Sequence, residues 1–357
     1  MLRTQTTPTS RDIEVNGHPS DTVSELQWSP TANYLAASSW DGSVRGWNVD
    51  QSGNSTGIFV YEHANKAPAL SVHWSYDGQK IASGGADNAA RLFDPNTQQS
   101  TQVGAHDAPV SCVRFVEGRD APSGNYILAT GSWDKTLKYW DLRQQTPIAT
   151  YTLPDRCYAM ESRFPMLAVA TAERHVQIFN LSGPTGRAQP YKTLNPSFRK
   201  QISCLGAFPK LDCIALGSIE GRVSIMYLEQ TTDGSGDFAY KCHRNEDLTV
   251  NAINVLAVNP VHGTFVTCAS DGSFVFWDKD ARSSLKKFPA QGIPIVSAAY
   301  NHTGNIFAYA LGYDWGKGYK NRDPNIKERI MLHACTDEET KPKPPMPKTG
   351  LQGNRRR

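Results

Sequence analysis

The chain repeats one tight corner, in which an acidic residue is followed six positions later by a large apolar residue. The six clear apolar anchors are Trp47, Phe93, Trp140, Phe179, Met226 and Trp277. Consecutive anchors are separated by 46, 47, 39, 47 and 51 residues, and a seventh, stretched copy lies around 310–332. A period in the forties with a Trp-Asp terminus is typical of propellers with four strands per blade. The sequence therefore predicts an all-β fold, a seven-bladed β-propeller of WD repeats.

Within each repeat the residues alternate as half-buried strands require. Leu70–Trp74 places apolar residues at every second position, Asp77-Gly78 turns the chain, and Ile81–Gly85 supplies a strand of small residues. No run of ten or more residues between such strands shows a helical period. Because one repeat cannot bury its own apolar face, we expect the blades to pack in a ring and share their core.

The repeats also predict the domain boundaries. Residues 12–340 form the propeller, and a short strand around Asp12–Val15 is expected to complete the last blade. Residues 1–11 are rich in Thr and Ser and are predicted to be disordered. Residues 341–357 hold three Lys, three Arg, four Pro and no acid, so we predict a basic, Pro-rich, disordered tail.

Charge, hydropathy and cysteine usage narrow the function classes. The net charge of +3 is too small for a polycation. The start of the chain lacks the apolar stretch of a signal peptide, and no apolar run approaches the roughly 20 residues of a membrane span, so no membrane partner is expected. The seven Cys show no CxxC spacing, which favours reduced thiols in a cytosolic or nuclear protein and no metal site.

Catalytic signatures are poor. There is no GxSxG, phosphate-binding glycine loop or HExxH motif. His106, Ser132 and Asp134 could suggest a nucleophilic triad. The better interpretation is a buried hydrogen-bond network that ties strands together, so we predict a protein that is not an enzyme and needs no cofactor.

Three stretches depart from the blade pattern, namely Glu220–Arg222, Phe238–Arg244 and Trp277–Arg282. If adjacent blades bring their loops to one face, these stretches form one basic patch that carries aromatic rings. Arginine forks suit the carboxylates of an acidic peptide, and aromatic rings with cations suit single-stranded nucleic acid. The alternative is that Tyr240 and Trp277 belong to the core and the charges form a solvated rim.

The same stretches carry a resemblance to a known family. Glu220–Val223, Tyr240–Arg244 and Asn259–Thr264 resemble the Gle-two or Rae-one family of nuclear-pore mRNA export factors and the related kinetochore checkpoint propeller. The insert in the seventh repeat, with Asp314, Trp315 and Lys317, is similar to the export factors and is lacking in the checkpoint protein. The resemblance spans roughly residues 20 to 335. Two departures are Tyr240, where the export family commonly has Phe, and Ser284, where a basic residue is common.

The resemblance implies a binding platform that docks on an FG-repeat nucleoporin carrying the Gle-two-binding segment and assists export of polyadenylated RNA. It implies a location in the nucleus, at the nuclear pore complex and nuclear envelope, with shuttling to the cytoplasm. The nucleoporin peptide would meet Arg222, Lys241 and Arg244. The face for single-stranded RNA or other acidic ligands would hold Tyr240, His243, Trp277, Asp278, Lys279 and Arg282. Two questions stay open: whether RNA contact is direct, and whether the chain serves instead as a mitotic checkpoint scaffold that binds an acidic motif of checkpoint kinases.

Overall fold

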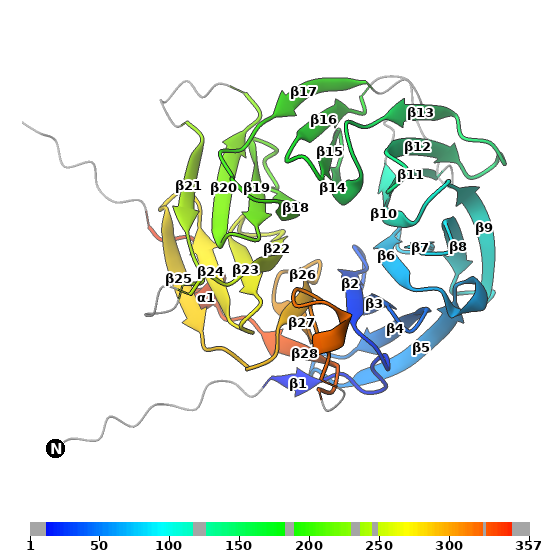
Figure 1. Ribbon diagram of the computed structural model, residues 1–357. Helices are drawn as coiled ribbons and strands as arrows, with labels where there is room; N and C mark the ends of the chain where they lie inside the picture. Colours follow the sequence, from blue (N-terminus) through cyan, green and yellow to red (C-terminus); the bar gives the residue numbers. More distant parts are fainter. Residues whose placement is uncertain are drawn as a thin grey trace, which may run out of the picture.

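Seven four-stranded sheets are arranged in a ring around a central channel (Figure 1). The computed structural model describes residues 12–116, 126–182, 189–229, 236–244, 249–323 and 326–344. Every pairing within the seven sheets joins antiparallel strands, and each sheet is one propeller blade. The predicted fold class and blade number are confirmed. The predicted disorder of residues 1–11 and of most of the tail lies outside the described residues.

The blades follow one another along the chain. Blade one is β2 (Val23–Trp28), β3 (Tyr34–Ser39), β4 (Ser43–Val49) and β5 (Ser55–Glu62); blade two is β6 (Ala69–Trp74), β7 (Ile81–Gly85), β8 (Ala89–Asp94) and β9 (Gln99–Ala105); blade three is β10 (Val110–Val116), β11 (Ile127–Ser132), β12 (Thr136–Asp141) and β13 (Ala149–Thr152). Blade four is β14 (Cys157–Arg163), β15 (Met166–Thr171), β16 (Val176–Asn180) and β17 (Pro190–Leu194); blade five is β18 (Ile202–Ala207), β19 (Cys213–Ser218), β20 (Arg222–Tyr227) and β21 (Phe238–Lys241). Blade six is β22 (Ile253–Val258), β23 (Phe265–Ala269), β24 (Phe274–Asp278) and β25 (Ser283–Phe288); blade seven is β26 (Ile295–Tyr300), β27 (Ile306–Leu311), β28 (Arg329–Ala334) and β1 (Ile13–Glu14).

Helical structure is sparse. Two 3-10 turns, η1 (Ala64–Lys66) and η2 (Tyr319–Asn321), and the short helix α1 (Asp337–Thr340) complete the assigned elements. None of the helices in the described part of the chain has the length and apolar character needed to cross a membrane.

The ring closes where the two ends of the propeller meet. Ile13 lies opposite Leu332 in the pairing of β1 with β28, which confirms the strand predicted around Asp12–Val15. Beside it, His333 contacts Asp12 at 2.8 Å and Glu339 of α1 at 3.3 Å. The first residues of the predicted tail also lie against the propeller, because the Lys343 amide donates to Asp278 at 2.8 Å. Both termini of the propeller are therefore tied to its last two blades.

Polar side chains at the second position of the innermost strands join neighbouring blades. Ser24 donates to the carbonyl of Ala69, and Ser111 donates to the carbonyl of Cys157. The side-chain amide of Asn254 donates in the same way to the carbonyl of Ile295 in the next blade. Apolar side chains from successive sheets, such as those of the buried cluster around Phe274 and Phe307, fill the space between the blades. This shared packing is the physical reason that no blade is an independent unit.

The ring has two faces with different loops. The turns after the second strand of each blade, such as Trp40-Asp41-Gly42, lie on the same face as the connections between blades, since the amide of Trp40 donates to Thr22 and that of His63 to Gly42. We call this the corner face. The turns after the first and third strands, such as 208–212 and 279–282, lie on the opposite face. The distinction decides which of the predicted site residues can meet.

Candidate functional site

A basic hollow of about 500 Å³ lies on the corner face at the corner of blade five. Arg222 begins β20 directly after the turn at Gly221, whose φ of 63° suits glycine, so its side chain starts at the rim of the ring. The hollow is lined by Arg199, Lys200, Ile219, Glu220, Arg222, Arg244 and Val250. It therefore joins the corner of blade five to the connections that enter blades five and six.

Among the described residues, four cationic side chains share this basic hollow with one carboxylate, so the described charges are unbalanced. That carboxylate, Glu220, accepts the backbone amide of Arg199 at 3.1 Å and lies 3.9 Å from the Arg222 guanidinium. The Arg244 guanidinium donates to the carbonyl of Glu220 at 3.3 Å. The Arg222 side chain is 34% exposed, and the one ion pair that it makes with the described residues is long, so its planar fork remains able to take a further carboxylate.

The predicted peptide-binding residues meet only in part. Arg222 and Lys241 are directly opposite in the pairing of β20 with β21, and Arg244 lines the hollow beside Arg222. Lys241 is exposed but does not line the hollow. The prediction from the sequence did not include Arg199 and Lys200. Their place could have been inferred, because an adjacent basic pair directly before an innermost strand must lie on the corner face.

The second predicted group does not form one patch with the basic hollow. In β24, Phe274 follows the corner of blade six, and Asp278 ends the strand on the opposite face. Lys279 accordingly contacts Asp212, in a turn of that opposite face, at 3.3 Å. The prediction that the three stretches form one patch is wrong, because it treated loops from both ends of the blades as if they shared a face.

Three members of that group are buried and already bonded. Asp278 accepts the backbone amides of Asp280 and Lys343 at 2.9 and 2.8 Å. Burial disfavours the charge of Lys279, but its hydrogen bond to Asp280 and its other acidic neighbours outweigh burial and raise its pKa. Burial lowers the pKa of His243 to about 4. These side chains stabilise the fold and do not form an open ligand face.

The other three lie along the outer seam between blades five and six. Tyr240 is half-buried, 4.9 Å between ring centroids from the half-buried Trp277. The exposed guanidinium of Arg282 lies 4.3 Å from the ring centroid of Phe238. Burial raises the pKa of Tyr240, and its hydroxyl has no hydrogen-bond partner among the described residues. The packing of Tyr240 and Trp277 therefore fits the alternative prediction, in which both rings belong to the core, better than it fits a groove on which bases stack.

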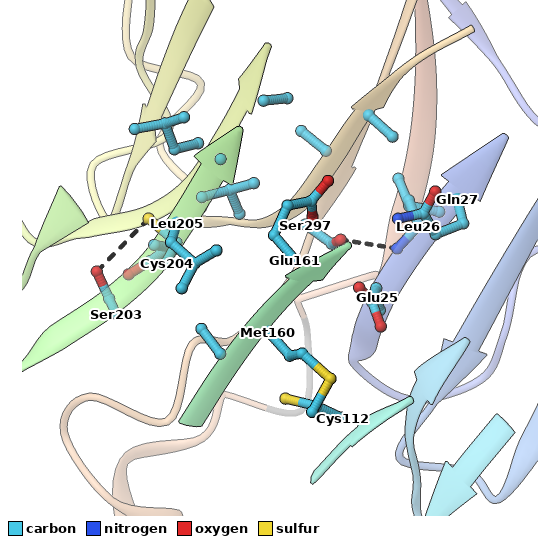
Figure 2. Close-up of a pocket in the computed structure, with 18 of the residues that line it drawn as sticks. Glu25, Leu26, Gln27, Cys112, Met160, Glu161, Ser203, Cys204, Leu205 and Ser297 are labelled. Carbon is cyan, nitrogen blue, oxygen red and sulfur yellow. Dashed lines mark hydrogen bonds between the residues drawn. The ribbon is translucent and has the colours of Figure 1, made fainter. Parts of the chain in front are cut away.

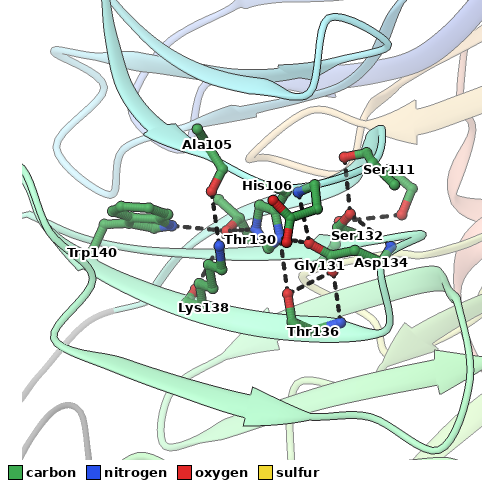
Figure 3. Close-up of polar contacts among 12 residues, drawn as sticks. Ala105, His106, Ser111, Thr130, Gly131, Ser132, Asp134, Thr136, Lys138 and Trp140 are labelled. Carbon is green, nitrogen blue, oxygen red and sulfur yellow. Dashed lines mark hydrogen bonds and ion pairs between the residues drawn. The ribbon is translucent and has the colours of Figure 1, made fainter.

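The suspected triad is a structural network, as the sequence indicated (Figure 3). His106 contacts Asp134 at 2.9 Å and Thr130 at 2.7 Å, and the indole of Trp140 donates to Thr130 at 2.8 Å. Ser132 donates to the carbonyl of Ala108, away from the imidazole. Burial lowers the pKa of His106, although Asp134 opposes this effect. Within the described part of the chain, no hydrogen bond joins the Ser132 hydroxyl to His106, so the arrangement ties strands together and does not make a nucleophile.

The central channel holds a pocket of about 290 Å³ that is lined by residues of the innermost strands, among them Glu25 and Glu161 (Figure 2). These carboxylates are also engaged. Glu25 accepts Arg114 and Ser71, each at 2.6 Å, and the amide of Val72 at 3.0 Å. Burial raises the pKa of Glu161, and Arg114 opposes this effect from 3.9 Å. The charges of the channel wall therefore bind one another and stabilise the innermost strands.

The insert of blade seven lies between β27 and β28 on the corner face. The side-chain amide of Asn254 donates to the Asp314 carboxylate at 3.3 Å, and Trp315 packs on Trp40 of the blade-one corner with 5.1 Å between ring centroids. Lys317 is exposed. The insert thus bridges blades six, seven and one, and it lies apart from the basic hollow of blade five.

Comparison with known proteins shows extensive similarity. The WD domain, G-beta repeat family matches residues 10–48, 55–94 and 97–141. The chain is 48% identical over 337 residues to the poly(A)+ RNA export protein of Schizosaccharomyces pombe, covering 94% of this chain and 93% of that protein. It is 40% identical to the mRNA export factor GLE2 of Chaetomium thermophilum, covering 94% of each chain.

Among solved structures, a chain in the crystal structure of the mitotic checkpoint complex superposes with a TM-score of 0.69. The match covers 94% of this chain and 98% of that chain, at 16% sequence identity. Similarity at that level of identity shows a common propeller fold.

Proposed function

Because this chain belongs to the family of WD40-repeat mRNA export factors, we propose that it docks an acidic segment of an FG-repeat nucleoporin in the basic hollow of blade five. The relatives indicate a role in mRNA export. The identity of the docking partner, an FG-repeat nucleoporin, is the part that we propose. The protein acts as a non-enzymatic adaptor that brings export cargo to the nuclear pore complex. Its place of action is then the nucleus and nuclear envelope, with shuttling to the cytoplasm.

The observation that carries the proposal is the surplus of cations around Arg222. Arg199, Lys200 and Arg244 share the hollow with it, and Glu220 is the one carboxylate among the described residues that line it. A carboxylate that loses its water on binding needs charge-assisted hydrogen-bond donors, and the planar guanidinium of an arginine supplies two such donors in one plane. Ile219 and Val250 are 44% and 40% exposed, so they can also receive an apolar side chain of the same peptide. The hollow suits an acidic segment with apolar residues between its carboxylates.

The checkpoint-scaffold alternative would use the same hollow for an acidic motif of a kinase. The match to a chain of the mitotic checkpoint complex concerns the fold alone and favours neither partner. The family relationship favours the export partner, so nucleoporin docking is the function that we propose.

Replacing Arg222 by Glu tests the proposal. The change puts a second carboxylate beside Glu220, and losing a buried charge partner costs about 2–5 kcal/mol, so affinity should fall at least about 30-fold. Calorimetry with a synthetic peptide of alternating Glu and Leu measures this loss directly. Capture from nuclear extract, read by mass spectrometry, should recover an FG-repeat nucleoporin with the parent and not with the variant.

Lys286→Glu is the matched control, because Lys286 is exposed on β25 and the charge change is equal. It should bind the peptide as the parent does. Melting temperatures should be similar for all three proteins, since the Arg222 head is partly exposed. Equal peptide affinity of Arg222→Glu and the parent would refute docking in the basic hollow. Recovery of checkpoint kinases alone from the extract would favour the alternative.

A further inference from the structure

Two thiols meet at the seam between blades three and four, away from the basic hollow of blade five. Cys112 lies in β10 and Cys157 begins β14, and both are free thiols buried in one apolar cluster. We propose that Cys112 and Cys157 form a redox modification site, at which hydrogen peroxide converts the two thiols to a reversible disulfide that links blades three and four. The site is independent of nucleoporin docking.

A glycine gives the second thiol its place at this seam. In the pairing of β10 with β11, Cys112 lies opposite Gly131. A Cβ placed on Gly131 would collide with the Cys157 Sγ, so the thiol of blade four fills the space that a side chain would take in blade three. The two thiols are in hydrogen-bond contact there. Ser111 also donates to the carbonyl of Cys157 at 2.8 Å, which holds the two strands that carry the sulfur atoms together.

The equivalent seam between blades five and six brings a thiol against an aliphatic side chain. Cys204 is the third residue of β18, as Cys112 is of β10, and it lies opposite Gly217. The side chain of blade six that approaches Gly217 is Ile253, whose Cγ2 would lie 3.0 Å from a Cβ placed there. In the six blades other than blade four, the first residue of the innermost strand is aliphatic: Val23, Ala69, Val110, Ile202, Ile253 and Ile295. The packing of the propeller therefore does not require a thiol at position 157.

Cys112 is the thiol that a small oxidant can reach. It lines the channel pocket of about 290 Å³, next to Met160 (Figure 2), and the side chain of Cys157 lies behind it. The hydrogen bond with the Cys157 thiol lowers the pKa of Cys112, and the positive charge of Arg114 acts in the same direction, although burial opposes both. The same hydrogen bond, together with burial, raises the pKa of Cys157. Cys112 is thus the attacking thiolate and Cys157 the resolving thiol.

The reaction consumes one molecule of peroxide for each disulfide. The Cys112 thiolate attacks one peroxide oxygen and the O–O bond breaks, which gives a sulfenic acid and a hydroxide that takes up the proton lost from the Cys112 thiol. The Cys157 sulfur then attacks the sulfenic sulfur, the S–S bond forms, and the hydroxyl group leaves with the Cys157 thiol proton as water. Two thiols lose two electrons, and hydrogen peroxide gains them to become two water molecules. A dithiol reductant restores both thiols by exchange.

The test is peptide mapping of the full chain after treatment of the reduced, folded protein with hydrogen peroxide. The remaining thiols are blocked with N-ethylmaleimide, and the protein is digested with trypsin without reduction. Mass spectrometry should recover residues 92–114 and 157–163 as one linked pair, because cleavage after Arg91, Arg114, Arg156 and Arg163 releases each cysteine in its own peptide. Dithiothreitol should separate the pair. The oxidised parent should also unfold at a higher urea concentration than the reduced parent, since a disulfide restricts the unfolded chain.

Cys157→Ala should abolish the linked pair and the gain in urea resistance. It should fold, because Ala69 fills the same place in blade two. The matched control is Cys204→Ala, which removes a thiol from the same position of another innermost strand in the wall of the same pocket and should keep the linked pair. The link is read directly in the parent, so the test does not depend on the folding of a variant. Absence of the linked pair from the folded parent, or its formation only after urea unfolding, would overturn the proposal.

Discussion

Replacing Asp12 by Asn should destabilise the closed ring and make its free energy of unfolding depend less on pH. His333 is 1% exposed and lies between Asp12 and Glu339, so it joins β1, β28 and α1. Burial opposes its charge, but the hydrogen bonds to Asp12 and Glu339 outweigh burial and raise its pKa from 6.5 to about 9. A raised pKa means that the protonated histidine is bound more favourably in the folded protein than in the unfolded chain.

The size of the effect follows from that pKa difference. A change from 6.5 to about 9 corresponds to about 3 kcal/mol of stability, at about 1.4 kcal/mol per pH unit. The contribution is fully present below pH 6.5 and is lost as the pH rises through about 9. Asn keeps the shape of Asp12 but removes its charge. We therefore expect Asp12→Asn to lower the free energy of unfolding by about 2 kcal/mol at neutral pH, the range for a charge-assisted hydrogen bond.

Urea unfolding followed by tryptophan fluorescence, repeated between pH 6.5 and pH 9, measures both quantities. The parent should lose about 2–3 kcal/mol across this range, which is up to about 2 kcal/mol more than the variant loses, because Glu339 still holds His333 in the variant. Glu62→Gln is the control, because it removes one charge from an exposed glutamate whose nearest cation, Lys66, is 3.9 Å away. It should follow the parent at every pH. If the curves of Asp12→Asn and the parent run parallel, His333 does not carry the proton and the reasoning fails.

Three further stability predictions concern the walls and seams of the blades. Glu25→Ala leaves the buried Arg114 without its 2.6 Å partner, so chemical unfolding should show a loss of about 3–5 kcal/mol. Gly46→Ala should cost about 1–3 kcal/mol in the same assay, because the new Cβ would lie 2.0 Å from the Phe59 ring. Tyr240→Phe removes a buried hydroxyl that has no partner in the described ranges and should leave the melting temperature unchanged or raise it; a clear fall would show that the hydroxyl is bonded.

Much of the fold could be read from local signals. The spacing from corner acid to apolar anchor predicts the blades because alternation and turn residues act over a few positions. The short strand at Ile13–Glu14 follows from the same counting, since the last blade otherwise lacks an outer strand. The structural interpretation of Asp134 also follows from the sequence, because it occupies the corner position at which an acid recurs from blade to blade.

The candidate site could be predicted only in part, because it depends on which loops share a face. Arg222 stands out in the sequence as a cation after a corner glycine. Arg199 lies 23 positions earlier, and the folding of blade five brings it to the same hollow, where its backbone amide donates to Glu220. Packing against Asp212 likewise turns Lys279 from an expected ligand contact into a buried support.

The sequence alone predicts the number of blades and the arginine corner, since both rest on patterns among near neighbours in the chain. Counting strands per blade also predicts the place of closure, although the closing contacts join the two ends of the propeller. The tertiary structure decided which charges remain free, because burial and pairing depend on residues from other blades. Asp278 and Lys279 are bonded within the fold, whereas Arg222, Lys317 and Lys320 remain on the corner face. A charge that is satisfied inside the protein cannot recognise a ligand, and no local pattern reveals in advance which charges those are.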